Sequence, residues 1–211
     1  MPLKPSSKAW MQRHINDTYV QLAQREGYRS RSAYKLLEIN ERDKLLLPGT
    51  IVIDLGAAPG GWSQVAGSRV GPHGKVYAID LLPMEGLAHV NFFQGDFTNL
   101  DLQARLREQL PKGGVDLVIC DMSPNMSGIP SADQARVFNL AEEALEFAKA
   151  VLKPGGAFLV KVFQGGDFEA FRQALFASFL KVAPRKPKAS REGSRELYML
   201  ARGLKQAPPT M

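Results

Sequence analysis

Residues 51–64, IVIDLGAAPGGWSQ, join a short apolar run to six consecutive small residues. In the run, isoleucine, valine and leucine surround a single aspartate, as in strands that a parallel sheet buries on both faces. The small residues let a ligand approach the backbone closely, and a helix that starts behind such a turn points its first N–H groups at the anionic part of the ligand. The stretch therefore predicts the first strand, turn and helix of a ligand-binding α/β domain.

The chain on either side of this stretch alternates strand-like and helix-like segments. Strands are expected at 50–56, 75–82, 89–97, 115–125, 157–163, 178–186 and 195–203. Helices are expected at 32–46, 61–70, 100–110, 132–153 and 167–179. This alternation predicts a mainly parallel seven-stranded sheet with an antiparallel last strand and helices on both faces. We expect a single domain at 31–204, preceded by a basic extension at 1–30 and followed by a frayed tail at 205–211.

Aspartates stand at or just past the ends of four expected strands, at Asp54, Asp80, Asp96 and Asp121. In open α/β sheets, ligands bind beyond the carboxyl ends of the strands, where these side chains fall. A single aspartate at such a place is more often a turn former or a helix cap. Four of them along one edge of a sheet favour a binding site.

The composition is that of a globular protein, with 45% hydrophobic residues, 23% charged residues and a net charge of +6. No apolar segment reaches the roughly 18–20 residues of a membrane-spanning helix. The single cysteine, Cys120, excludes an intrachain disulfide, and the three histidines follow no metal-ligand spacing. We therefore expect a protein of a reducing, cytoplasmic compartment with no metal site.

Basic residues gather near both ends of the chain. The two groups are Lys4, Lys8, Arg13, Arg25, Arg29 and Arg31, and then Lys181, Arg185, Lys186, Lys188, Arg191 and Arg195. If the groups converge in the fold, they form one surface for a phosphate-rich ligand. The charge pattern leaves a second interpretation open, in which both groups are solvated, flexible segments.

The glycine turn matches neither of two common phosphate-binding loops. It lacks the G-x-G-x-x-G spacing of dinucleotide sites and the Gly-Lys-Ser/Thr of a P-loop. The form DLGAAPGG instead resembles the cofactor loop of S-adenosylmethionine-dependent methyltransferases. In that comparison, Asp80 accepts hydrogen bonds from the ribose hydroxyls and Asp96 accepts from the adenine amine. The leucine and methionine side chains of 81–84 then form part of the slot for the base, and Trp62 either covers the cofactor or fastens helix to sheet.

Lys161 lies inside the apolar run 157–163, AFLVKVF. Lysine is rare in buried strands, and burial of an ammonium group lowers its pKa, as a general base requires. A lysine that reaches solvent at a strand end, or a structural ion pair, is the alternative. The apolar surroundings favour a catalytic role.

Seven motifs occur in the order known from one family of RNA-modifying enzymes. They are SRSAYKL (30–36), DLGAAPGGWSQ (54–64), DLLPM (80–84), QGDF (94–97), DMSPNMSG (121–128), LVKVFQG (159–165) and SRELY (194–198). By these motifs the chain, from Trp10 to Arg202, resembles the FtsJ/RrmJ family of S-adenosylmethionine-dependent RNA 2′-O-ribose methyltransferases. The resemblance implies a Rossmann-like class I methyltransferase fold, a monomer, and methylation of a uridine in the A-loop of 23S ribosomal RNA within the 50S subunit.

The resemblance also implies roles for individual residues. The family's catalytic tetrad falls on Lys35, Asp121, Lys161 and Glu196. Its cofactor positions fall on Gly56, Gly60, Trp62, Asp80, Asp96 and Asp121. We expect Lys161 to accept the proton of the 2′-hydroxyl while Asp121 orients it and favours the sulfonium. The other two tetrad members position the ribose. The two basic groups, rather than the resemblance, lead us to expect RNA contacts from Lys4, Lys8, Arg29, Arg31, Lys188, Arg191 and Arg195.

Three alternatives remain beside this interpretation. A nicotinamide-dependent oxidoreductase could share the sheet and the ribose-binding acid, but the G-x-G-x-x-G turn is missing. A non-catalytic RNA-binding or ribosome-assembly factor could keep the fold, although the tetrad is complete. Within methyltransferases, transfer RNA or mitochondrial ribosomal RNA is the alternative substrate.

Overall fold

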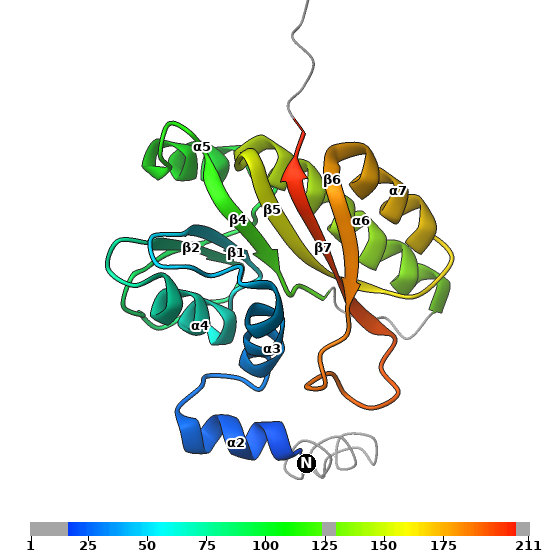
Figure 1. Ribbon diagram of the computed structural model, residues 1–211, viewed down its shortest axis with the longest axis horizontal. Coiled ribbons are helices and arrows are strands. Elements are labelled where there is room, and N and C mark those ends of the chain that lie inside the picture. The colour runs from blue at the N-terminus through cyan, green and yellow to red at the C-terminus, as the bar shows by residue number, and fades with distance from the viewer. Residues whose placement is uncertain (1–16, 124–129, 206–211) are drawn as a thin grey trace, which may run out of the picture.

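The computed structural model describes residues 17–123 and 130–205, and a seven-stranded sheet forms its centre (Figure 1). The strands are β1 (Ile51–Leu55), β2 (Lys75–Asp80), β3 (Val90–Gln94), β4 (Val115–Cys120), β5 (Leu152–Phe163), β6 (Phe179–Arg185) and β7 (Glu196–Leu204). The helices are α2 (Thr18–Glu26), α3 (Ala33–Asp43), α4 (Gly61–Val70), α5 (Leu100–Gln109), α6 (Pro130–Val151) and α7 (Phe168–Ser178). The predicted RNA contacts Lys4 and Lys8 lie outside the described residues, as does the tail from 206 onward.

The strands follow the order β3-β2-β1-β4-β5-β7-β6 across the sheet. Neighbours from β3 to β5 run parallel, whereas β7 runs antiparallel to both β5 and β6. The predicted sheet, mainly parallel with an antiparallel last strand, is therefore confirmed. Because β7 lies beside β5, Glu196 stands opposite Phe163 and Tyr198 stands opposite Lys161. The carboxyl ends of β1 and β4 are also neighbours, with Leu55 opposite Cys120.

Helices cover both faces of the sheet (Figure 1). On one face α5, α6 and α7 bury Leu106, Phe138 and Phe171, and on the other α3 and α4 bury Leu36 and Val65. Successive side chains of β4 pack alternately into the two apolar clusters, because neighbouring side chains of a strand point to opposite faces of the sheet. The central strands are therefore mostly apolar on both faces, which made them recognisable in the sequence. Within residues 17–123 and 130–205, no helix combines the length and the hydropathy that a bilayer-spanning segment needs.

Helix α2 was not among the predicted elements, because the basic residues around it suggested an irregular extension. It begins at an N-cap, Asp17, whose carboxylate accepts a hydrogen bond from the Tyr19 N–H at 3.0 Å. It ends at Gly27, which has a φ of 75° and caps the helix in the left-handed conformation. The helix buries Val20 and Ala23, so this part of the predicted extension packs on the rest of the fold.

Candidate active site

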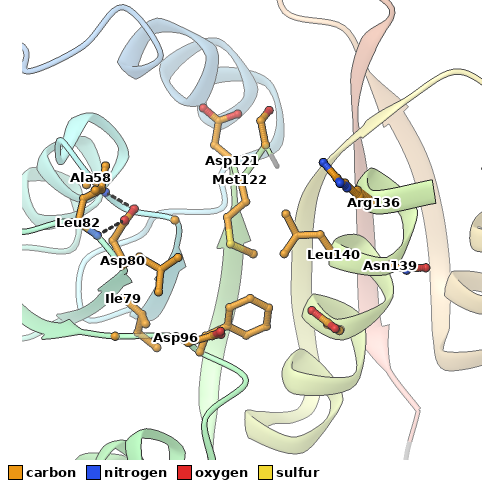
Figure 2. A pocket seen from close by; sticks show the side chains of 16 residues that line it. Ala58, Ile79, Asp80, Leu82, Asp96, Asp121, Met122, Arg136, Asn139 and Leu140 are labelled. Carbon is orange, nitrogen blue, oxygen red and sulfur yellow. Dashed lines mark hydrogen bonds between the residues drawn. The ribbon is translucent and has the colours of Figure 1, made fainter. Parts of the chain in front are cut away.

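A cavity of about 640 Å³ opens at the carboxyl ends of the central strands. Three of the predicted strand-end carboxylates, Asp80, Asp96 and Asp121, line it (Figure 2). Arg136 and Leu140 of α6 form the opposite wall, which the sequence gave no reason to assign to the site. The predicted strand-end location of a ligand site therefore corresponds to a real cavity, bounded in addition by a helix.

The glycine turn forms one wall of this cavity and packs closely against other parts of the chain. Gly56 lines the cavity with a φ of 74°, and a Cβ atom there would come within 2.2 Å of the Met122 side chain. Gly60 precedes α4 with a φ of 110°, and its missing Cβ leaves room for the Arg29 guanidinium and Met84. Because these glycines have no side chain, other parts of the chain can pack directly against the turn. At Gly56, a side chain would collide with Met122 at the wall of the cavity.

Asp80 holds the glycine turn in place from the end of β2. Its carboxylate accepts hydrogen bonds from the backbone N–H of Ala58 at 2.9 Å and of Leu82 at 2.8 Å (Figure 2). Leu81 and Leu82, the next residues, line the cavity and are 67% and 65% exposed. Asp96, past the end of β3, accepts from the N–H and the hydroxyl of Thr98. Two carboxylates and an exposed apolar surface thus face one cavity.

Two residues of the glycine stretch face the protein core. Asp54 is fully buried and accepts a hydrogen bond from the Ser63 hydroxyl at 2.6 Å, and burial raises its pKa to about 7. The expectation that all four strand-end aspartates face one ligand is wrong for Asp54, because its place within β1 directs the side chain toward α4. Trp62 is 2% exposed and donates from Nε1 to the Ser32 carbonyl at 2.8 Å, so its side chain fastens α4 to the start of α3.

The four residues of the predicted tetrad form two ion pairs. The Lys161 ammonium lies 3.2 Å from Asp121 Oδ1 and donates to the Asp121 carbonyl at 2.7 Å. The Lys35 ammonium lies 2.7 Å from Glu196 Oε1. The side chains are between 7% and 15% exposed, and they come from β5, the end of β4, α3 and the start of β7. Asp121 also lines the cavity, so the first pair stands at its edge.

Tyr198 joins the two ion pairs. Its hydroxyl donates to Asp121 Oδ1 at 2.7 Å, and its ring centroid lies 5.7 Å from the Lys35 ammonium. The ring also packs against Trp62, with centroids 5.5 Å apart. Burial, and next the charge of Asp121, raise the pKa of Tyr198 well above its ordinary value, so the hydroxyl stays a donor. The sequence analysis missed Tyr198, since a tyrosine in an apolar strand is indistinguishable from a core residue.

The Glu196 carboxylate stays ionised because it is paired with the Lys35 ammonium. Burial by itself raises the pKa of Glu196, but the Lys35 ammonium, and more weakly Lys161, outweigh burial and lower it below the ordinary value. A negative charge therefore stands beside Lys35 at neutral pH. The buried thiol of Cys120, just before Asp121, has a pKa raised to about 12 by burial, so it is inert as a nucleophile.

The described parts of the two basic regions lie side by side in the fold. Arg31 pairs with Asp17 at 2.9 Å, and Arg191 approaches the same carboxylate at 3.8 Å. The predicted RNA contacts differ in exposure: Lys188, Arg191 and Arg195 are exposed, whereas the Arg31 side chain is 14% exposed. The Arg29 guanidinium donates to the carbonyls of Glu85 at 2.7 Å and Gly86 at 2.9 Å, and thus fastens the chain after β2.

The described residues offer no group of three histidine, cysteine or carboxylate side chains that could hold a metal ion. What the site does offer is a cavity with carboxylates and apolar surface, next to a lysine paired with an aspartate. Such a site suits a cofactor that carries hydroxyl, amine and cationic groups, and a reaction in which one proton is moved.

Comparison with known proteins gives this site its class. Residues 28–204 match the model of the FtsJ-like methyltransferases, and the chain belongs to this family. It is 58% identical over 200 residues to the ribosomal RNA large subunit methyltransferase E of Dechloromonas aromatica, with 95% of this chain and 98% of that protein covered. It is 54% identical over 203 residues to the protein of the same name from Chromobacterium violaceum, with 96% and 99% covered.

Solved structures confirm the predicted fold class. A ribosomal RNA methyltransferase structure from Plasmodium falciparum superposes with a TM-score of 0.78 at 27% sequence identity, covering 85% of this chain and all of that one. An rRNA methylase structure from Clostridium thermocellum shares the fold, with a TM-score of 0.53 at 18% identity, covering 81% and 97%. The fold is therefore that of a class I methyltransferase.

Proposed function

We propose that this protein transfers a methyl group from S-adenosyl-L-methionine to the ribose 2′-hydroxyl of a uridine in the A-loop of 23S ribosomal RNA, within the 50S subunit. One observation carries the proposal: Asp121 lines the cavity and also pairs with Lys161 at 3.2 Å, so a cofactor site adjoins a candidate base. The names of the relatives at 54–58% identity support ribosomal RNA as the substrate. We place the reaction in the cytoplasm and assign it to a monomer.

The lining of the cavity fits S-adenosylmethionine. Leu81 and Leu82 present apolar surface to the adenine ring, and Asp96 is an acceptor for its amine. Asp80 already accepts two backbone N–H groups, but a carboxylate has about four acceptor sites, which leaves capacity for the ribose hydroxyls. Asp121 offers negative charge to the sulfonium and amino groups. In this proposal Gly56 and Gly60 shape the turn, and Trp62 supports it from behind.

The bound cofactor supplies a methyl group on a sulfonium, which is already activated for displacement. The chain has to align the 2′-oxygen and to take one proton from it. Lys161, in its neutral form, accepts that proton at Nζ. The ammonium that results is held by the carbonyl and the carboxylate of Asp121, which lie 2.7 Å and 3.2 Å from it. Lys35 and Glu196, joined at 2.7 Å, orient the ribose next to Lys161.

RNA recognition in this proposal relies on backbone phosphates, since methylation of a ribose requires little reading of bases. The exposed side chains of Lys188, Arg191 and Arg195 supply direct contacts, together with Lys4 and Lys8. Arg29 and Arg31 support this surface through their internal partners. Reversal of the charge at Arg191 and Arg195 should weaken RNA binding and flatten its salt dependence by roughly one unit of slope per lost phosphate contact.

A methyl-transfer assay tests the proposal. Tritiated S-adenosylmethionine is added to undermethylated 50S subunits, to protein-free 23S ribosomal RNA and to bulk transfer RNA, and the labelled ribose is mapped. We expect label at one uridine 2′-oxygen in the 50S subunits and little in protein-free RNA. Label in transfer RNA alone would favour the alternative substrate. Binding to 50S subunits without transfer would favour a non-catalytic assembly factor.

A further inference from the structure

The chain between β6 and β7 carries exposed basic residues, and a glutamate of α3 fastens its middle. We name residues 186–195, KPKASREGSR, the basic segment. The Glu38 carboxylate of α3 accepts hydrogen bonds from two successive backbone N–H groups of this segment, Lys188 at 2.6 Å and Ala189 at 2.9 Å. Hydrogen bonds to a charged acceptor are about twice as strong as neutral ones. The middle of the basic segment is therefore tied to α3.

Further contacts fix the same segment at its middle and at its base. Ala189 is fully buried in a small apolar cluster with Ala23 of α2 and Tyr34 of α3, and its carbonyl accepts from Arg31 at 2.8 Å. The Lys186 ammonium donates to the carbonyls at 194 and 196, which closes the base of the segment. These contacts leave the side chains of Lys188, Arg191 and Arg195 exposed.

Helix α3 also holds the end of the basic segment. Lys35 lies one turn before Glu38 on the helix, and it pairs with Glu196, the residue that follows the segment. One helix therefore positions both the middle of the basic segment and a member of the catalytic tetrad. A shift of the segment relative to α3 would move its cationic side chains relative to the Lys35–Glu196 pair.

We propose that Glu38 is a positioning residue that holds the basic segment as a preformed docking surface for the phosphate backbone of the RNA substrate, in register with the catalytic pair. This proposal rests on the proposed function. An ordered surface binds more tightly than a mobile one because the chain has already lost its conformational entropy. Loss of the Glu38 contacts should therefore weaken binding of the RNA substrate, while the cavity, which Glu38 does not line, is unaffected.

The change in net charge on removal of Glu38 predicts stronger RNA binding, whereas the loss of an anchor predicts weaker binding, so the two explanations can be distinguished. Removal of a glutamate beneath a cationic surface makes that surface more positive, and this change by itself strengthens RNA binding. If Glu38 is only a surface charge, then E38A and E38Q should bind RNA at least as well as the unaltered protein. If Glu38 is an anchor, both variants should bind RNA less well despite their higher positive charge.

The experiment compares E38A and E38Q with E41A, a matched control on the exposed side of the same helix. Three measurements are made: the steady-state kinetics on undermethylated 50S subunits, which give KM and kcat, the Kd of S-adenosylmethionine by calorimetry, and the rate of tryptic cleavage after Lys188 and Arg191. We expect KM to rise roughly 5- to 20-fold in E38A and less in E38Q, with cofactor Kd changed less than about twofold. Tryptic cleavage should be several-fold faster in both, because the segment opens locally. E41A should match the unaltered protein in all three.

An unchanged or lowered KM together with an unchanged cleavage rate would overturn the proposal. If E38A fails to fold, E38Q supplies the same comparison, since it keeps one carbonyl acceptor. The cleavage rate and RNA binding in a filter assay require no methyl transfer. If the unaltered protein methylates no ribosomal substrate, the proposed function fails, whereas faster cleavage and weaker RNA binding in E38A would still support the anchor.

Discussion

The two ion pairs of the candidate active site are built from different parts of the fold. Lys161 and Asp121 stand at the ends of neighbouring strands, β5 and β4, and their positions follow from the parallel sheet. Lys35 and Glu196 come from a helix on one face of the sheet and from the start of the antiparallel strand β7. The first pair is a product of local strand geometry, and the second depends on how distant segments of the chain meet.

This difference suggests that the two ion pairs act on different parts of the reaction. Asp121 faces the cofactor cavity while Lys35 shares its helix with Glu38, the anchor of the basic segment. In the proposed function, the Lys161–Asp121 pair would serve the cofactor side of the site and the Lys35–Glu196 pair the substrate side. Tyr198 lies between them, with its hydroxyl on Asp121 and its ring beside Lys35.

The largest effect is expected from Lys161→Met, which removes the proposed base. Turnover on 50S subunits should fall by about 10³-fold, the range that a general base contributes, and Lys161→Arg should not rescue it, because a guanidinium does not lose its proton. Calorimetry should give a cofactor Kd close to that of the unaltered protein. Near-normal single-turnover rates in Lys161→Met would contradict the assignment of Lys161 as the base.

A smaller effect is expected when the second pair is removed. Lys35→Met and Glu196→Gln should each lower kcat/KM by roughly 10- to 100-fold. The kcat/KM of the double variant should be no lower than that of the less active single variant, because both residues act as a unit. Each single variant leaves one partner buried and unpaired, so each should unfold at lower urea concentration than the double variant. Additive losses in a double-mutant cycle would show that the two residues work separately.

The same division explains what could be predicted from the sequence. The strands and the sheet follow from hydrophobic runs, and the structure confirms them. The rule for open α/β sheets places Asp80, Asp96 and Asp121 at one edge, where they line the cavity. Lys161 stood out because lysine is unusual in an apolar strand. These features are local, and a local pattern is enough to reveal them.

The other part of the site could not be read from local patterns. Nothing near Lys35 in the sequence points to Glu196, which lies 161 residues later, and the pair was predicted only through the family resemblance. Tyr198 resembles a core residue, and Glu38 resembles a solvated helix charge. Their roles depend on the insertion of β7 between β5 and β6, which brings the basic segment against α3.

Tyr198→Phe should separate the two pairs without removing either. The loss of one hydrogen bond to Asp121 should lower turnover about threefold to tenfold. Asp121 keeps its ion pair with Lys161, and Lys35 and Glu196 keep their own pair. Single-turnover rates on 50S subunits measure the effect, with urea unfolding of both proteins as the control. A rate equal to that of the unaltered protein would indicate that Tyr198 serves packing only.

The smallest effect on the reaction is expected at Asp54, a carboxyl of the same sheet edge that pairs with none of the described lysines or arginines. Burial raises its pKa to about 7 from 3.8, so between these pH values the folded state holds a proton that the unfolded state has lost. Its contribution to stability is complete below about pH 4 and is lost as the pH rises through 7. Asp54→Asn, which is neutral at every pH, should therefore gain stability relative to the unaltered protein, on the order of 4 kcal/mol, between pH 4 and pH 8. Urea unfolding at both pH values measures the difference, with Asp101→Asn on the exposed surface of α5 as the control. If the two unfolding curves keep the same separation at both pH values, Asp54 is ionised in the fold, and the contrast with the lysine-paired Asp121 disappears.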